Sequence, residues 1–255
     1  MRTLLLLALL CGAAALADRP FPATWQSAPL TTSAPDVQTW VNARYGRANA
    51  GYTRFDVRVL VAQPVAPKLD TLYGLELDLE SFGVPARTID PRLASVWRYG
   101  FTSADDVVGV GVLAKLGLGF SLLDVEARLV VDKRVGNVLL AFNASAARTA
   151  WWAGPAGIDT RFEQSLAAQY TMQGAFSAGF EARAREAFMR GVYQGTALLL
   201  GPTCAYSSKR WWLSIGLSLQ VGADKAVADR GNGEIFEVRD NERFGARVAV
   251  GVVLD

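Results

Sequence analysis

The chain of 255 residues is long enough for one large all-β domain or for two small domains. Its 26 Lys and Arg residues nearly balance its 24 Asp and Glu residues, which argues against a nucleic-acid partner. Histidine is absent, which excludes serine–histidine catalysis and removes a common metal ligand. Outside the N-terminus, no apolar run approaches the roughly 20 residues of a membrane-spanning helix.

The N-terminus predicts a cleavable secretory signal over residues 1–17. A basic start, an apolar centre and a small-residue exit place the cleavage before Asp18. The alternative is a lipoprotein signal with Cys11 as the lipidated residue, but Leu10 occupies a position where such signals carry a small residue. After cleavage before Asp18, Cys204 is the one cysteine left, so we expect no disulfide and a small apolar packing role for Cys204.

Residues 18–36 are rich in Pro, Ser, Thr and Ala, and we expect them to form a periplasmic lead-in. From residue 37 onward, apolar and polar residues alternate with the period of two that is typical of β-strands. The alternation predicts about twelve strands, near residues 37–46, 52–62, 71–80, 93–101, 107–119, 121–132, 136–148, 160–171, 174–186, 194–205, 209–221 and 242–254.

Alternation alone suits a soluble sandwich and a membrane barrel equally, because these folds differ in which face meets water or lipid. Three features favour the barrel. The segments approach the length of a tilted membrane-spanning strand. Aromatic residues gather near segment ends, where barrels meet lipid headgroups, and glycines recur on one face of 107–119, as a curved wall requires. We therefore predict an all-β, transmembrane antiparallel up-and-down β-barrel over residues 37–255.

The connections between the predicted strands alternate in length. They are short after the second, fourth, sixth, eighth and tenth strands, and longer after the third, seventh and eleventh, including 149–159 and 222–241. Short turns face the periplasm in bacterial barrels and longer loops face outward. The lengths therefore place the lead-in and the short turns on the periplasmic side.

Several stretches carry a resemblance to known barrels. They are Arg19–Trp25, Gln38–Arg44, Tyr52–Arg58, the hairpin Glu126–Asn143, Leu200–Pro202 with Arg210–Leu213, and the closing strand Glu242–Val248. As a set they resemble a broad group of poorly characterised proteobacterial outer-membrane barrels, described as porin-like or transporter proteins and akin to barrels beside meta-pathway phenol-degradation genes. The resemblance implies fold, location and insertion by the barrel-assembly machinery, and it provides no agreed substrate or catalytic site to carry over. Such barrels commonly end on an aromatic residue, whereas this chain ends on Asp255.

The expected inward face carries charges of both signs. The candidates for lining the lumen are Arg44, Arg54, Asp56, Arg58, Glu76, Asp78, Glu80, Arg98, Lys115, Glu126, Arg128, Arg161, Glu163, Glu181, Arg183, Arg185 and Arg247. The three carboxylates of strand 71–80 could bind a cation or catalyse a reaction, but pairing with Arg54 and Arg58 of the adjacent strand is the favoured interpretation. We also expect Glu163 to meet Arg183.

These features predict a passive channel or transporter-like barrel in the outer membrane, in contact with its lipid and passing small solutes. We expect no enzymatic activity, cofactor or metal. The alternative is a closed structural or adhesive barrel that binds a partner through its outer loops, because large inward side chains such as Trp40, Arg98 and Trp212 could fill the bore. Trp151 and Trp152 could stack on a ring-shaped ligand, but anchoring at the membrane interface is favoured.

Overall fold

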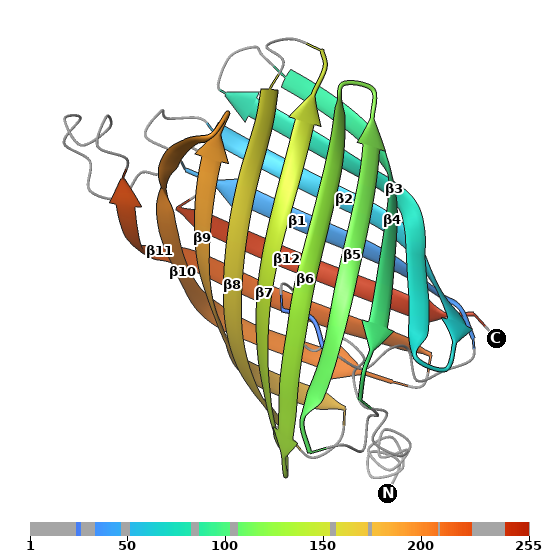
Figure 1. Ribbon diagram of the computed structural model, residues 1–255. Coiled ribbons are helices and arrows are strands. Elements are labelled where there is room, and N and C mark those ends of the chain that lie inside the picture. Colours follow the sequence, from blue (N-terminus) through green and yellow to red (C-terminus); the bar gives the residue numbers. More distant parts are fainter. Residues whose placement is uncertain are drawn as a thin grey trace, which may run out of the picture.

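The computed structural model describes residues 24–26, 34–46, 52–82, 87–102, 107–153, 157–172, 175–208, 210–225 and 243–254. These residues form a closed barrel of twelve strands in which each strand pairs antiparallel with the next, and β12 pairs with β1 (Figure 1). The strands are β1 (Asp36–Tyr45), β2 (Tyr52–Ala66), β3 (Leu69–Phe82), β4 (Arg87–Gly100), β5 (Gly109–Gly119), β6 (Leu122–Val135), β7 (Val138–Trp151), β8 (Gly157–Thr171), β9 (Phe176–Met189), β10 (Val192–Ser207), β11 (Trp211–Lys225) and β12 (Phe244–Val253).

The predicted all-β, up-and-down barrel is confirmed, with one difference at the fourth strand. β4 begins at Arg87, whereas the sequence predicts a start at residue 93. Pro91 interrupts the sequence pattern, yet it pairs with Leu77 of β3 and lies beyond the last pair between β4 and β5. A missing N–H is tolerated at such an edge-like position. No helix of the described chain is long and apolar enough to cross a membrane.

The predicted alternation of loop lengths is only partly correct. We call the end where β1 begins and β12 ends the terminal end, and the opposite end the loop end. The turns after β2 and β6 at the terminal end have two residues each, but the connection after β4 spans 101–108. The longer loops predicted after the third and seventh strands shrink to 83–86 and 152–156, because the flanking strands extend into them. The added residues continue the pairing of the strands, as Ser81 does with Arg87 and Trp151 with Gly157.

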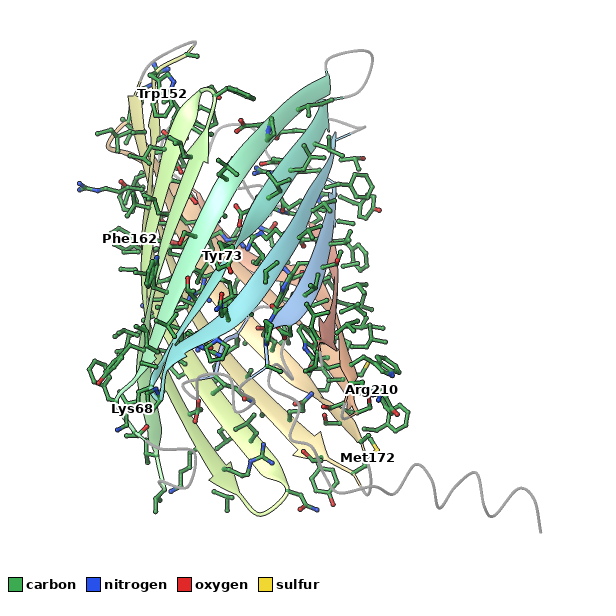
Figure 2. The ribbon with its side chains drawn as sticks, turned by 90° about the vertical axis from the view of Figure 1, so that its right-hand side faces the viewer. Lys68, Tyr73, Trp152, Phe162, Met172 and Arg210 are labelled. Atoms are coloured by element: carbon green, nitrogen blue, oxygen red, sulfur yellow. The ribbon has the colours of Figure 1, made fainter. Side chains whose placement is uncertain are left out.

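The outer surface of the barrel is apolar, and much of its interior is polar. Leu93 is 64% exposed and Phe180 is 60% exposed, whereas Asn143 is only 1% exposed. Figure 2 shows side chains along the whole outer surface, Phe162 among them. Cys204 is exposed on the outward face of β10 rather than packed in a core, contrary to our expectation. This arrangement is the reverse of a soluble sandwich and is typical of barrels surrounded by lipid.

Aromatic rings cluster near both ends of this outer surface. At the loop end, Tyr45 packs against Phe55 and Phe244, with ring centroids 6.1 and 6.2 Å apart. At the terminal end, the rings of Tyr206 and Trp211 lie 4.7 Å apart. Two aromatic clusters separated by a band of aliphatic residues match the girdles that border the lipid-facing band of membrane barrels.

Candidate functional site in the barrel lumen

The lumen of the barrel has two different halves along its axis. In the terminal half, inward residues of β2 to β5 form an apolar cluster with Trp25 and Trp40 packed against it. The cluster consists of Leu60, Ala62, Leu72, Ala94, Val96 and Leu113. In the loop half, a cavity of about 780 Å³, here called the upper cavity, is lined mainly by charged residues of β1 to β6, β8 and β9. The polar chemistry of the lumen therefore lies in the loop half.

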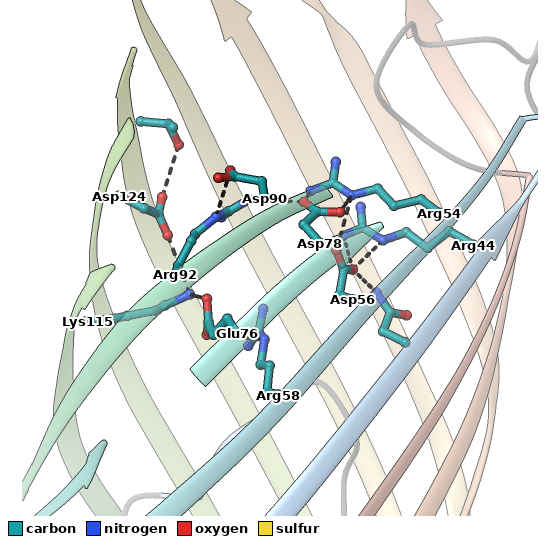
Figure 3. A network of polar contacts seen from close by, with 12 residues as sticks. Arg44, Arg54, Asp56, Arg58, Glu76, Asp78, Asp90, Arg92, Lys115 and Asp124 are labelled. Carbon is teal, nitrogen blue, oxygen red and sulfur yellow. Dashed lines mark hydrogen bonds and ion pairs between the residues drawn. The ribbon is translucent and has the colours of Figure 1, made fainter. Parts of the chain in front are cut away.

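One wall of the upper cavity holds a chain of ion pairs (Figure 3). The Nε of Arg44 donates to Asp56 at 2.9 Å, and the Nε of Arg54 donates to Asp78 at 2.7 Å. Arg54 also lies 3.1 Å from Asp56, and Arg92 lies 3.0 Å from Asp78. Because inward residues of neighbouring strands face each other, alternating charges along the wall neutralise one another.

A second group of ion pairs lies deeper on the same wall. The Nζ of Lys115 lies 2.7 Å from Glu76 and 3.4 Å from Asp124. The Nε of Arg58 lies 3.3 Å from Glu76. The predicted pairing of the β3 carboxylates with Arg54 and Arg58 is therefore confirmed for Asp78 and Glu76. This pairing leaves neither carboxylate as an uncompensated acid, which disfavours a catalytic role.

Below the upper cavity lies a smaller cavity of about 130 Å³, here called the lower cavity. On its wall, Arg128 pairs with Glu126 at 2.7 Å and Arg185 pairs with Glu163 at 2.9 Å. The predicted contact between Glu163 and Arg183 is wrong. Register places Arg185 directly opposite Glu163 and Arg183 opposite Ser165, so the nearer arginine takes the ion pair.

The terminal half is filled partly by residues 24–26, here called the plug. The Thr24 hydroxyl donates to Glu181 at 2.5 Å and lies 3.0 Å from the Ser165 hydroxyl, from which it can accept. The backbone N–H of Trp25 donates to the side-chain oxygen of Asn143 at 2.7 Å, and the Asn143 amide donates back to the Trp25 carbonyl at 2.9 Å. We expected residues 18–36 to form a periplasmic lead-in, but Thr24 and Trp25 lie inside the barrel because inward polar groups of β7 to β9 bind them.

Three tryptophan rings form a stack beside the plug. Trp25 stacks on Trp40 with ring centroids 6.0 Å apart and an interplanar angle of 15°, and Trp40 meets Trp212 edge-on at 6.0 Å. The indole of Trp212 lies over Gly251 of β12, where a Cβ atom would overlap the ring. The large inward residues Trp40 and Trp212 therefore narrow the bore together with Trp25.

A buried ion pair also lies in the terminal half. Arg98 is 1% exposed and Asp70 is 0% exposed. The Nε of Arg98 lies 3.1 Å from both carboxylate oxygens of Asp70, and the two residues are opposite each other in the register of β3 and β4. This pair adds a fixed, desolvated contact to the apolar half of the lumen.

The structure places all of the predicted lumen residues on the inward face. Those that line the upper cavity are Arg44, Arg54, Asp56, Arg58, Glu76, Asp78, Glu80, Lys115, Glu126, Arg161 and Arg185. Arg128, Glu163 and Arg247 line the lower cavity. Arg98 pairs with Asp70, Glu181 binds Thr24, and Arg183 of β9 is 3% exposed. A role for these residues in conduction stays a prediction.

Sequence reasoning missed several inward charges of the described chain, including Asp36, Asp159 and the four discussed next. Asp90 and Arg92 lie before the predicted start of their strand at residue 93, and Asp70 lies just before the predicted start of its strand at residue 71. Asp124 was missed although it shares the face of Glu126 two residues later, so the period of two could have identified it.

The two neighbouring tryptophans of β7 and its loop have separate roles. Trp151 donates its indole N–H to Asp159 at 2.9 Å and lines the upper cavity. Trp152 is exposed and donates its indole N–H to the carbonyl of Phe120 at 2.8 Å. Trp152 alone therefore has the exposure that interfacial anchoring requires.

No family model matches the chain, and no curated protein matches it. Its fold is similar to that of an outer membrane channel from Pseudomonas putida F1, with a TM-score of 0.64, 12% identity, and coverage of 89% of this chain and 98% of the other. The NanC porin gives a TM-score of 0.56 at 10% identity, covering 87% and 100%. The β domain of the Bordetella autotransporter BrkA gives 0.57 at 12% identity, covering 86% and 98%.

What these proteins share with the chain is the fold. The similarity supports the closed barrel fold that the sequence predicted, and the likeness to barrels beside phenol-degradation genes stays a prediction.

Proposed function

We propose that this protein is an outer-membrane channel that passes small polar solutes. The observation that carries the proposal is a hollow, charged lumen enclosed by an apolar outer surface. A barrel of this kind provides a watery path through hydrocarbon, because the charges that would be costly in lipid are turned inward and paired.

The proposal is also supported by what two proteins of the same fold are called. Two of the barrels with the same fold are an outer membrane channel and a porin. The same proposal includes location in the outer membrane, export by the predicted signal over residues 1–17 and insertion by the barrel-assembly machinery. Residues 1–17 and Asp255 lie outside the described residues.

The test is the conductance of the refolded protein in a planar lipid bilayer. A channel gives stepwise currents that scale with salt concentration, and a protein that inserts yet gives no current in any salt contradicts the proposal. Insertion is checked separately by heat-modifiable gel migration. Since Trp25 and its partners narrow the terminal half, we expect small current steps for the unmodified protein.

A closed barrel that binds a partner through its outer loops is the second candidate. The stack of Trp25, Trp40 and Trp212 favours it, because the rings and the Arg98–Asp70 pair occupy the terminal half of the bore. The β domain of an autotransporter shows that this fold is not restricted to proteins named as channels. Absence of current both in the unmodified protein and in a Trp25→Ala variant would favour this candidate.

A further inference from the structure

Arg161 differs from the other cations that line the upper cavity. Arg44, Arg54 and Lys115 each lie in an ion pair with a carboxylate of a neighbouring strand. Arg161 lines both the upper and the lower cavity. In the part of the chain that the structure describes, its guanidinium makes no hydrogen bond and no ion pair within 4.0 Å. A guanidinium with five free N–H donors therefore lies at the junction of the two cavities.

The net charge of the lining residues changes between the two cavities. Seven cationic and eight acidic side chains line the upper cavity, so its charges nearly cancel. Seven cationic and four acidic side chains line the lower cavity, which leaves an excess of three positive charges. A small anion entering from the loop end would therefore meet a nearly neutral cavity first and a positive one beneath it.

Two arginines lie on the far wall: Arg247, which is one of the seven cations of the lower cavity, and Arg183, which does not line that cavity. Arg247 of β12 lines the lower cavity, and its Nε donates to Asn42 at 3.1 Å. Arg183 of β9 is 3% exposed, and its Nη1 has no hydrogen-bond partner in the described structure. Arg247 lies within electrostatic range of Arg183 and also of the carboxylates of Glu163 and Glu181. The buried inward residues between the two arginines on β10 and β11 carry no charge: Leu199, Gly201, Gly216 and Ser218.

We propose that the lower cavity binds a small anion with a carboxylate or phosphate group, held by Arg161, Arg185 and Arg247, with Arg183 adding to the field. Guanidinium groups bind both anion types through paired N–H donors, and a free guanidinium such as that of Arg161 gives up no existing partner. The proposal names the solute class of the proposed channel, and in that respect it rests on the proposed function.

The direct test is equilibrium binding of inorganic phosphate and of benzoate to the folded protein in detergent, at constant ionic strength. Trp25 and Trp40 line the lower cavity, so tryptophan fluorescence reports its occupancy. We expect saturable binding, and we expect Arg161→Gln to weaken it about tenfold or more, as loss of a hydrogen-bonded charge does. Binding of neither probe, or binding that never saturates, would overturn the proposal.

A matched control separates a site from a general effect of charge. Arg92→Gln removes one guanidinium from the upper cavity and none from the lower one. We expect less than about a twofold change for this variant, because its guanidinium lies outside the site and is screened. Equal weakening by the two variants would overturn the proposal. If Arg161→Gln does not fold, as judged by heat-modifiable migration, Arg247→Gln takes its place with the same expected result.

Binding and conductance together distinguish this proposal from the channel function. Saturable binding with no current supports the anion site and contradicts the channel. Current without saturable binding contradicts the site and leaves the channel standing. Where both are present, we expect an anion-selective reversal potential in a KCl gradient that shifts toward zero in Arg161→Gln.

Discussion

The two halves of the lumen are made by the same strands but have opposite interiors. The loop half is a cavity of about 780 Å³ whose charges are mostly paired across strands. The terminal half contains an apolar cluster, three tryptophan rings and one desolvated ion pair. Strand alternation determines which residues face inward, and side-chain size and polarity decide whether that interior is open or filled. In the channel that we propose, the filled terminal half would limit passage, and the charged cavities above it would set which solutes are favoured.

The largest expected effect comes from breaking the buried ion pair of the terminal half. Asp70→Leu leaves the guanidinium of Arg98 desolvated without its partner, so we expect a loss of about 3–5 kcal/mol in the free energy of unfolding. Urea unfolding followed by tryptophan fluorescence measures this loss. Asp90→Asn, which removes a more exposed pair with Arg92, is the control, with an expected change of about 0–1 kcal/mol. Similar losses in both variants would contradict the division into a filled and an open half.

Removing the Trp25 ring of the plug tests, by conductance, whether the filled half limits the current. In Trp25→Ala we expect a several-fold increase in single-channel current, because the ring that stacks on Trp40 is lost. Trp152→Ala, which removes an exposed ring at the loop end, is the control and leaves the current unchanged. If the two variants conduct alike, the narrowest part of the path lies outside the aromatic stack.

A smaller loss of stability than in Asp70→Leu is expected at Gly251, the glycine beneath the aromatic stack. Gly251→Ala places a Cβ where the indole of Trp212 lies, so the ring must move or the strands must separate. Overpacking of this kind costs about 1–3 kcal/mol of unfolding free energy. Gly222→Ala is the matched control, since its Cβ would lie 3.7 Å from Leu198, an ordinary contact. Equal stability of the two variants would show that Trp212 has room elsewhere in the lumen.

The smallest loss of stability is expected for ion pairs in the open loop half of the lumen. Arg58 lies 3.3 Å from Glu76 and is partly exposed to the cavity, and Glu76 keeps Lys115 as a second partner. We therefore expect Arg58→Gln to change the unfolding free energy by less than about 1 kcal/mol, with the difference shrinking as salt is added. A loss as large as that of Asp70→Leu would show that the loop half is as rigidly desolvated as the terminal half.

Strand alternation predicted the barrel and most of the inward charges of the described chain, because a period of two assigns each side chain to a face without knowledge of its neighbours. The pairing of Glu163 with Arg185 rather than Arg183 depends on the register between β8 and β9, which alternation leaves open. The plug could not be predicted at all. Thr24 and Trp25 belong to a segment without periodicity, and their partners lie 118 to 157 residues away in the chain.

The aromatic stack also lies across the seam of the barrel. Trp40 belongs to β1 and Trp212 to β11, and between them β12 pairs with β1, joining Asp36 to Val253 at opposite ends of the chain. The indole N–H of Trp212 also points to the Asp36 carboxylate at 3.4 Å. Pairing of such distant segments carries a high loop-closure cost and forms slowly. The contacts of Trp212 with Trp40 of β1 and Gly251 of β12 therefore add side-chain packing to the hydrogen bonds that join the first and last strands.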